Sequence, residues 1–139
     1  MTRLKEKPKN MKKKFILILK IIAAVIMLQT LFYKFSGAQE SIELFTKIAG
    51  DREVYMRIGT GILEFIASIM LFSKLNSWFG AFLTIGLMGG AVFSHLTKLG
   101  IEHNNDGGLL FGSAVLILII GLIVLFKERK NIPIVGNRL

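Results

Sequence analysis

Four long apolar runs alternate with short polar segments along the chain, at residues 15–35, 56–72, 78–99 and 107–126. A membrane-spanning helix needs about 20 mainly apolar residues, because the hydrocarbon core is about 30 Å thick and each residue rises about 1.5 Å. Residues 115–120 are continuously apolar, unlike the alternating strands of a membrane barrel. The pattern therefore predicts an all-α membrane protein, a bundle of four transmembrane helices.

The polar segment between the first two runs has a helical pattern of its own. Ile42, Phe45, Ile48 and Ala49 recur at three- and four-residue spacing among charged residues. This spacing predicts a short amphipathic helix at the membrane interface. The chain then divides into a basic segment at residues 1–14, a membrane domain at 15–126 and a basic tail at 127–139.

The composition agrees with a membrane protein. Apolar residues make up 53% of the chain and charged residues 19%, with a formal net charge of +9. Seven of the 18 basic residues precede Phe15, beside an apolar run and without interleaved aromatic residues. This arrangement favours an anionic lipid surface over nucleic acid. We therefore expect the lipid bilayer as a partner and no nucleic acid.

Basic residues that flank the spans predict the orientation, since cytoplasmic loops carry an excess of them. With the N-terminus inside, twelve lie on the inner side and five on the outer side. The inner set comprises Arg3, Lys5, Lys7, Lys9, Lys12, Lys13, Lys14, Lys74, Lys127, Arg129, Lys130 and Arg138, and the outer set Lys34, Lys47, Arg52, Arg57 and Lys98. We expect a bacterial inner-membrane protein with both termini in the cytoplasm. A cleaved signal peptide ending near Ala38 is the alternative, but its apolar run would be unusually long.

Several kinds of chemistry are excluded or unsupported. The chain has no cysteine, which excludes disulfides, thiol catalysis and zinc–thiolate sites. Glu102, His103 and Asp106 have metal-ligand side chains, but their spacing fits no closed metal site, and residues 104–108 are typical of a turn. We expect a solvated loop there, no metal site and no intrinsic cofactor. Asp106 would lie near the start of the fourth span, where a negative charge is favourable.

Polar residues inside the apolar runs are the candidates for function. Glu64 lies about 12 Å into the second span at a helical rise of 1.5 Å per residue. A charge at the bilayer centre costs about 2.5–3.5 kcal/mol on insertion scales, so Glu64 should face the bundle and be paired or protonated. Arg57, Thr60 and Ser68 fall on the same helical stripe.

These residues predict one polar pocket open toward the outer side. The candidate pocket residues are Lys34, Arg57, Thr60, Glu64, His95 and Lys98. Glu64 would be the acid, His95 its hydrogen-bond or proton partner, and Lys34 and Arg57 the compensating cations. The pocket could bind a quinone, a proton or another small ligand. Alternatively, Glu64 pairs with Arg57 or Lys34 only to hold the helices in register.

Small residues four positions apart occur twice, at Gly86 and Gly90 and at Gly108 and Gly112. Such pairs let helix backbones approach closely in a membrane. They predict either packing within the four-helix bundle or an interface with a second copy or a redox-enzyme partner.

Three segments resemble the DoxX-like family of small bacterial four-span membrane proteins. They are Leu31–Gly37, with Lys34; Gly59–Ala67, with Glu64; and Gly86–Leu96, which ends near His95. The name-giving member is linked to a thiosulfate:quinone oxidoreductase, so the resemblance implies contact with a quinone and functional roles for Lys34, Glu64 and His95.

The function we expect is a membrane subunit or accessory of a redox, quinone-linked or stress-response system. The chain would bind quinone for a partner, without independent catalytic activity. Two alternatives stay open: a small proton- or ion-coupled transporter or channel subunit, and a purely structural membrane anchor.

Overall fold

The computed structural model describes residues 2–133 and 136, and side chains from residue 10 onward. It contains the α-helices α1 (Thr2–Ser36), α2 (Gln39–Ala49), α3 (Glu53–Met70), α4 (Ser77–Ser94) and α5 (Leu109–Lys127). Shorter turns are η1 (Gly50–Arg52), the π-helical η2 (His95–Leu99) and η3 (Arg129–Asn131). Over these residues the chain is all-helical, which confirms the predicted fold class.

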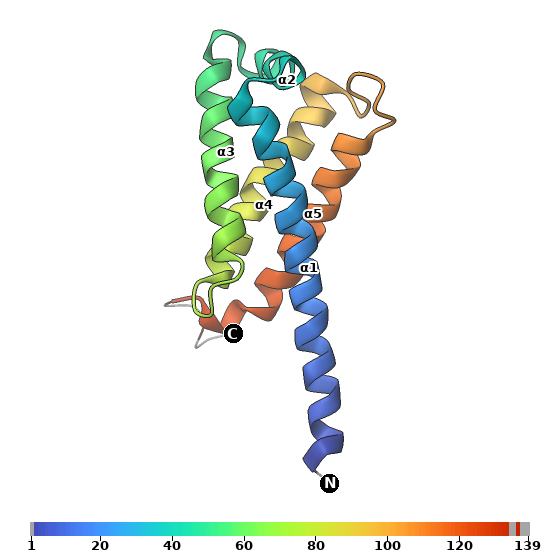
Figure 1. Ribbon diagram of the computed structural model, residues 1–139, viewed down its shortest axis with the longest axis vertical. Helices are drawn as coiled ribbons and strands as arrows, with labels where there is room; N and C mark the ends of the chain where they lie inside the picture. The colour runs from blue at the N-terminus through green and yellow to red at the C-terminus, as the bar shows by residue number, and fades with distance from the viewer. Residues whose placement is uncertain (1, 134–135, 137–139) are drawn as a thin grey trace.

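Four helices form the bundle, and α2 lies across one end of it (Figure 1). Around the bundle, α3 packs between α1 and α4, and α5 packs against α4 and α1. We call the end covered by α2 the α2 end. The opposite end, with residues 71–76 and η3, is the tail end. The predicted amphipathic helix between the first two long helices is confirmed: α2 buries Phe45 and turns Glu40 outward.

The helix α1 is longer than the first apolar run. It begins at Thr2, before the predicted span start at residue 15, and its first turns project beyond the tail end (Figure 1). Arg138 and the side chains of Arg3, Lys5, Lys7 and Lys9, which entered the predicted orientation, lie outside the described part.

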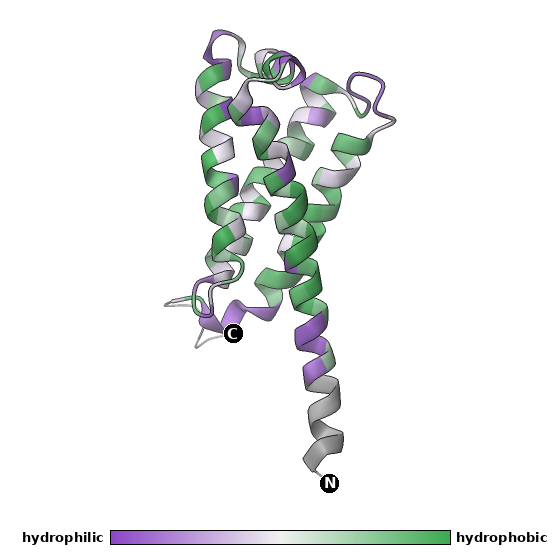
Figure 2. Ribbon diagram, in the orientation of Figure 1, coloured by the Kyte–Doolittle hydropathy of each residue, from purple (hydrophilic) through white to green (hydrophobic). Residues whose placement is uncertain are grey.

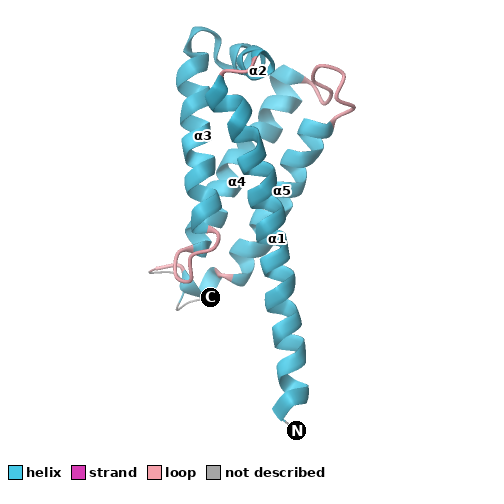
Figure 3. Cartoon of the chain, viewed as in Figure 1, coloured by secondary structure: helices cyan, strands magenta, loops and turns pink. Residues whose placement is uncertain are grey.

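By length and apolarity three helices qualify as membrane spans, rather than the four predicted. They are Asn10–Ser36, Ser77–Leu99 and Leu109–Lys127. The helix α3 falls short because its 18 residues include Glu53, Arg57 and Glu64. Apolar residues dominate the middle of all four long helices (Figure 2), which are connected by short loops together with α2, η1 and η2 (Figure 3).

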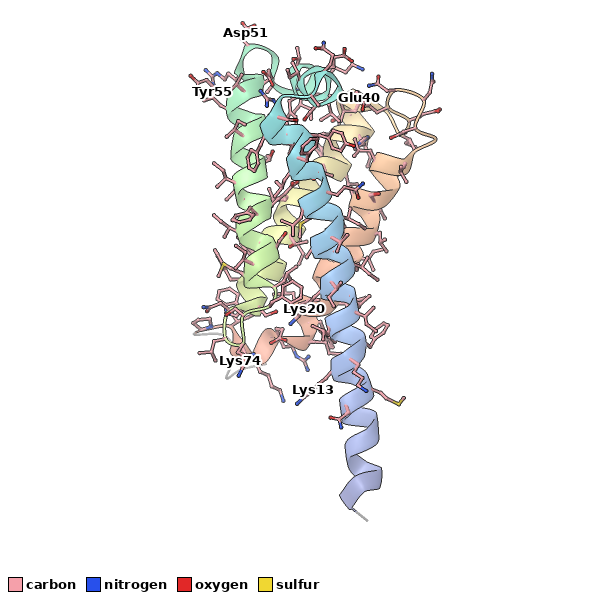
Figure 4. All side chains as sticks on the ribbon, viewed as in Figure 1. Lys13, Lys20, Glu40, Asp51, Tyr55 and Lys74 are labelled. Atoms are coloured by element: carbon pink, nitrogen blue, oxygen red, sulfur yellow. The ribbon has the colours of Figure 1, made fainter. Side chains whose placement is uncertain are left out.

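The outer surface of the bundle is apolar along the middle of the helices, and charged side chains lie toward its ends. Phe82 and Phe93 are 59% and 66% exposed, as expected of side chains that face hydrocarbon rather than water. Figure 4 shows Asp51 at the α2 end, and Lys20 and Lys74 toward the tail end. This distribution matches a membrane protein in contact with the lipid bilayer.

Two close helix contacts in the tail half of the bundle are made at glycines. A Cβ on Gly80 would lie 2.6 Å from the backbone nitrogen of Leu71, so α3 and α4 meet there backbone to backbone. A Cβ on Gly121 would lie 3.0 Å from Ile85, so α5 meets α4 closely as well. Close contact of this kind drives helix association where lipid is as apolar as the helices.

The glycine pairs singled out from the sequence do not mediate this packing. A Cβ on Gly86, Gly90 or Gly112 would meet nothing within 4 Å among the described residues. Gly108 instead adopts a left-handed conformation before α5. The internal-packing interpretation of these pairs is therefore wrong, because a spacing of four shows only that two residues share a face, and that face here meets no helix.

Candidate functional site

Glu64 lies inside the bundle and is paired with α1. Its residue is 4% exposed, and its Oε1 accepts a hydrogen bond of 2.6 Å from Nζ of Lys34. The hydroxyl of Thr30 lies 3.3 Å from Oε2, while it also donates to the Met27 carbonyl at 2.7 Å. Thr30 and Lys34 are four residues apart and therefore share one face of α1, which is the face that meets Glu64. The prediction that Lys34 compensates Glu64 fits this geometry.

Arg57 has a different partner from the one predicted. Its Nε donates to Oε2 of Glu53 at 2.9 Å, one turn earlier on α3. One of its terminal nitrogens donates to the backbone carbonyl of Lys34, near the end of α1. Arg57 therefore neutralises Glu53 and satisfies a carbonyl that the end of α1 leaves free, rather than compensating Glu64.

His95 begins the π-helical turn that follows α4. The ring is buried, and its Nδ1 lies 2.9 Å from the Gly100 carbonyl oxygen. A carbonyl only accepts, so Nδ1 carries the hydrogen, and in this tautomer Nε2 is the acceptor nitrogen. The expected hydrogen bond from His95 to Glu64 is not formed among the described residues, and Nδ1 is instead bonded to the carbonyl of Gly100, five residues further along the chain. An edge-on contact with Phe111, at 5.7 Å between ring centroids, fixes the ring plane.

Lys98 and Thr60 are held by backbone carbonyls. Nζ of Lys98 donates to the Ile48 carbonyl at 3.0 Å, which ties η2 to the last turn of α2. The Thr60 hydroxyl donates to the Met56 carbonyl at 2.8 Å within α3. Both residues are thus positioned without using a charged partner.

A cavity of about 600 Å³ lies among α1, α3, α4 and α5, beneath α2. Five of the six sequence-predicted residues line it: Lys34, Thr60, Glu64, His95 and Lys98. Arg57 is not among the lining residues. The rest of the wall is mostly apolar, with Met27 and Met88 toward the tail end and Phe45 of α2 across the α2 end. Lys34 also lies 5.9 Å from the Phe45 ring centroid.

This arrangement offers a ligand both donors and an acceptor within apolar walls. The Lys34 ammonium has three N–H donors, and one of them bonds to Oε1 of Glu64. His95 Nε2 has no hydrogen-bond partner among the described residues and is a site for an incoming donor. Ligand pockets of about 300–1,000 Å³ with a few convergent polar groups are the usual form of small-molecule sites.

The loop between η2 and α5 is less solvated than expected. His103 is 6% exposed, and neither ring nitrogen has a hydrogen-bond partner among the described residues. Burial, and then the nearby Lys47 ammonium, lower the pKa of His103 below its ordinary value. The expectation of a wholly solvated loop is therefore wrong at His103, because the turn folds its ring inward.

Asp106 caps the start of α5. Its Oδ2 accepts from the Leu110 N–H at 3.0 Å, and its Oδ1 accepts from Gly108 at 2.8 Å and His103 at 3.2 Å. Burial acts to raise the pKa of Asp106, but these three N–H donors outweigh it and leave the pKa lowered. Over the described residues no cluster of three or more metal-ligand side chains occurs.

Sequence reasoning missed two structural features near the site. Glu53 was not recognised as the partner of Arg57, although their spacing of four within one helix is the usual signal for such a pair. The π-helical turn at His95–Leu99 left no signal in the apolar pattern.

Comparison with known proteins identifies the family. The DoxX family model matches residues 15–96, which is more than half of the chain and includes Lys34, Thr60, Glu64 and His95. No curated protein and no solved structure matches the chain. The matched stretch runs from the first long helix through the start of the π turn, and it holds the acid, its cation and the histidine of the cavity. The chain belongs to the DoxX family.

Proposed function

We propose that this DoxX protein binds a small ligand with a quinone-like head in the cavity beneath α2, as a membrane subunit or accessory of a redox or stress-response system. One observation carries the proposal: the Lys34–Glu64 pair is buried on the wall of a cavity of about 600 Å³ that His95 also lines. Ionisable residues inside a membrane are expensive and commonly mark ligand or proton pathways.

The cavity residues fit a quinone head. A ring oxygen can accept from the Lys34 ammonium, and a ring hydroxyl of the reduced form can donate to Nε2 of His95. A bound quinone would supply two-electron, two-proton chemistry to a partner enzyme. The residues of this chain would bind and orient the head, while Glu64 holds the Lys34 ammonium in place from the other side.

We further propose that α3 is the fourth span, despite its composition. Its ionisable side chains are neutralised within the bundle: Glu64 by Lys34, and Arg57 and Glu53 by each other. Paired charges that face the bundle escape most of the penalty for lying in hydrocarbon. With four spans and the basic residues inside, both termini are cytoplasmic and α2 lies at the outer face of a bacterial inner membrane.

The substitution Glu64→Gln tests the site in membranes. Glutamine keeps the volume of the side chain but removes the charge that holds Lys34. We expect binding of a photoreactive short-chain benzoquinone to weaken about tenfold, the loss of about 1.4 kcal/mol. The measurement is concentration-dependent photolabelling of the protein in native membranes.

The variant Glu53→Gln is the matched control, because it makes the same change on α3 outside the cavity lining. It should leave labelling unchanged while both variants insert at normal levels. Equal labelling of wild type and Glu64→Gln would remove the ligand-site proposal. If Lys34→Met with Glu64→Leu were then as stable as wild type, the pair would be only a structural link, since apolar replacement of buried ion pairs is often tolerated.

A further inference from the structure

The exposure of the lining residues indicates where a ligand can enter the cavity. At the α2 end the apolar face of α2 covers it, through Leu44, Phe45 and Ile48. Phe45 is only 6% exposed, and the hydrogen bond from Lys98 to the Ile48 carbonyl holds this cover against η2. The end nearest to water is therefore closed by packed side chains.

The side formed by α1 and α5 is closed as well. The cavity residues there include Met27, Ala114 and Ile117, which are 1%, 6% and 2% exposed. Toward the tail end, α3 and α4 close together where Gly80 meets Leu71 and Ala67. A ligand cannot enter from these directions without displacing the core.

The side between α3 and α4, in contrast, has an exposed lining. Met56 of α3 and Phe93 of α4 are 38% and 66% exposed, and both line the cavity. Gly86 and Gly90 of α4 line it too, and both are exposed with no neighbour near the position of a Cβ among the described residues. In Figure 1 α4 leans away from α3 toward the α2 end. Because glycine has no side chain, Gly86 and Gly90 leave this side of the cavity unobstructed.

We propose that the ligand enters sideways from the bilayer between α3 and α4, over Gly86 and Gly90. The opening lies along the middle of apolar helices, where the surrounding medium is hydrocarbon. The occupant is therefore a lipid-dissolved amphiphile, whose compact polar head reaches Lys34 and His95 and whose apolar tail stays between the two helices. A cavity of about 600 Å³ holds a ring head but leaves a long tail outside. This inference rests on the proposed binding function and adds the route and the class of ligand.

The neighbouring glycines of α4 provide a matched test. Gly89 also has nothing within 4 Å of a Cβ among the described residues, but it does not line the cavity. The probe is a benzoquinone with a decyl tail that ends in a diazirine, added to vesicles containing the protein. We expect Gly90→Leu to reduce photolabelling about tenfold, because a leucine there fills the opening, and Gly89→Leu to leave it unchanged.

The sites of crosslinking on the wild-type protein give a second, independent result. A tail that leaves through the side opening should crosslink to Met56 and Phe93, located by mass spectrometry. Crosslinks on α2 instead, or equal labelling of Gly90→Leu and wild type, would overturn the sideways route while leaving the binding site intact. Absence of any wild-type labelling would overturn the binding function itself, so the two failures are distinguishable.

Discussion

Four ionisable side chains of α1 and α3 form two ion pairs of different kinds. Arg57 and Glu53 are one turn apart on a single helix, so their 2.9 Å contact follows from helical geometry. Lys34 and Glu64 lie on different helices and meet at 2.6 Å only because both face the bundle interior. The first pair is local and holds the end of α1, while the second links α1 to α3 on the cavity wall. The two pairs therefore respond differently to substitution.

His103 is buried without such a partner among the described residues, so its contribution to stability depends on pH. Its ring is buried near Lys47, Asp106, His95 and Glu43, and burial followed by Lys47 lowers its pKa from 6.5. The unfolded chain takes up a proton near pH 6.5, while the folded chain does so only at lower pH. Protons therefore favour unfolding, and stability contributed by neutral His103 should be lost as pH falls from 6.5 to the folded pKa.

We expect the thermal midpoint of the detergent-solubilised protein to fall by a few degrees between pH 7.5 and pH 5. In His103→Met this part of the pH dependence should disappear, since methionine fills the buried space without titrating. Asp106 titrates below this range because its pKa is lowered, so it should not contribute. A His103→Met variant with the same pH profile as wild type would show that the ring is not the group responsible.

In α4 and α5, glycine serves two purposes: it allows close contact between helices at some positions and leaves space beside the cavity at others. Gly80 and Gly121 allow close backbone contact, whereas Gly86 and Gly90 leave empty space beside the cavity. The difference predicts opposite effects of one change. A Cβ on Gly80 would meet three backbone atoms of α3 within 3.1 Å, and backbone cannot move aside cheaply.

We expect Gly80→Ala to destabilise the bundle by about 1–3 kcal/mol, the usual range for overpacking. Gly86→Ala should instead be neutral or stabilise by about 0.5–1 kcal/mol, because alanine is the better helix former and meets no neighbour. Unfolding in mixed detergent micelles measures both variants. The packing account of Gly80 is wrong if the two substitutions have the same effect.

The apolar pattern was sufficient to predict the helices but not the use of their glycines. Long apolar runs indicate helices because hydrocarbon offers the backbone no other partner, and α2 was visible from the spacing of Ile42, Phe45 and Ile48. Gly86 and Gly90 satisfied the rule for close packing, but whether a neighbour is present depends on the rotation and tilt of α4. The rotation and tilt of α4 are set by contacts such as that of Gly80 with Leu71, which no simple sequence pattern predicts.

The candidate site was predictable to a similar extent. The cost of a charge in lipid indicated that Glu64 would face inward and find a cation, and Lys34 lies beside it. The orientation of His95 was not predictable, because a π-helical turn inserts an irregular step after α4 and redirects its Nδ1 to Gly100. The burial of His103 depends on a loop fold that only the capping by Asp106 and its neighbours specifies.

At the scale of the whole molecule, the structure constrains how α3 can sit in a membrane. Its first turns contact the end of α1 through Arg57, and its last turn accepts at the Leu71 carbonyl from Ser77, where α4 begins. The end of α1 and the start of α4 lie at opposite ends of the bundle (Figure 1). The helix α3 thus runs between the same two levels as its neighbours, and its 18 residues extend about 27 Å at 1.5 Å per residue.

Labelling of single cysteines can test this topology, because the chain has no cysteine of its own. We expect Glu40→Cys on α2 and Asn76→Cys before α4 to react with a membrane-impermeant maleimide from opposite sides of sealed vesicles. Lys130→Cys should react from the same side as Asn76→Cys, since η3 lies at the tail end. A three-span arrangement would require α3 to lie on one surface, so both ends of α3 would label from one side. That result would also expose Glu64 and Lys34 to an environment unlike the interior of a bundle, and would exclude a cavity within the membrane.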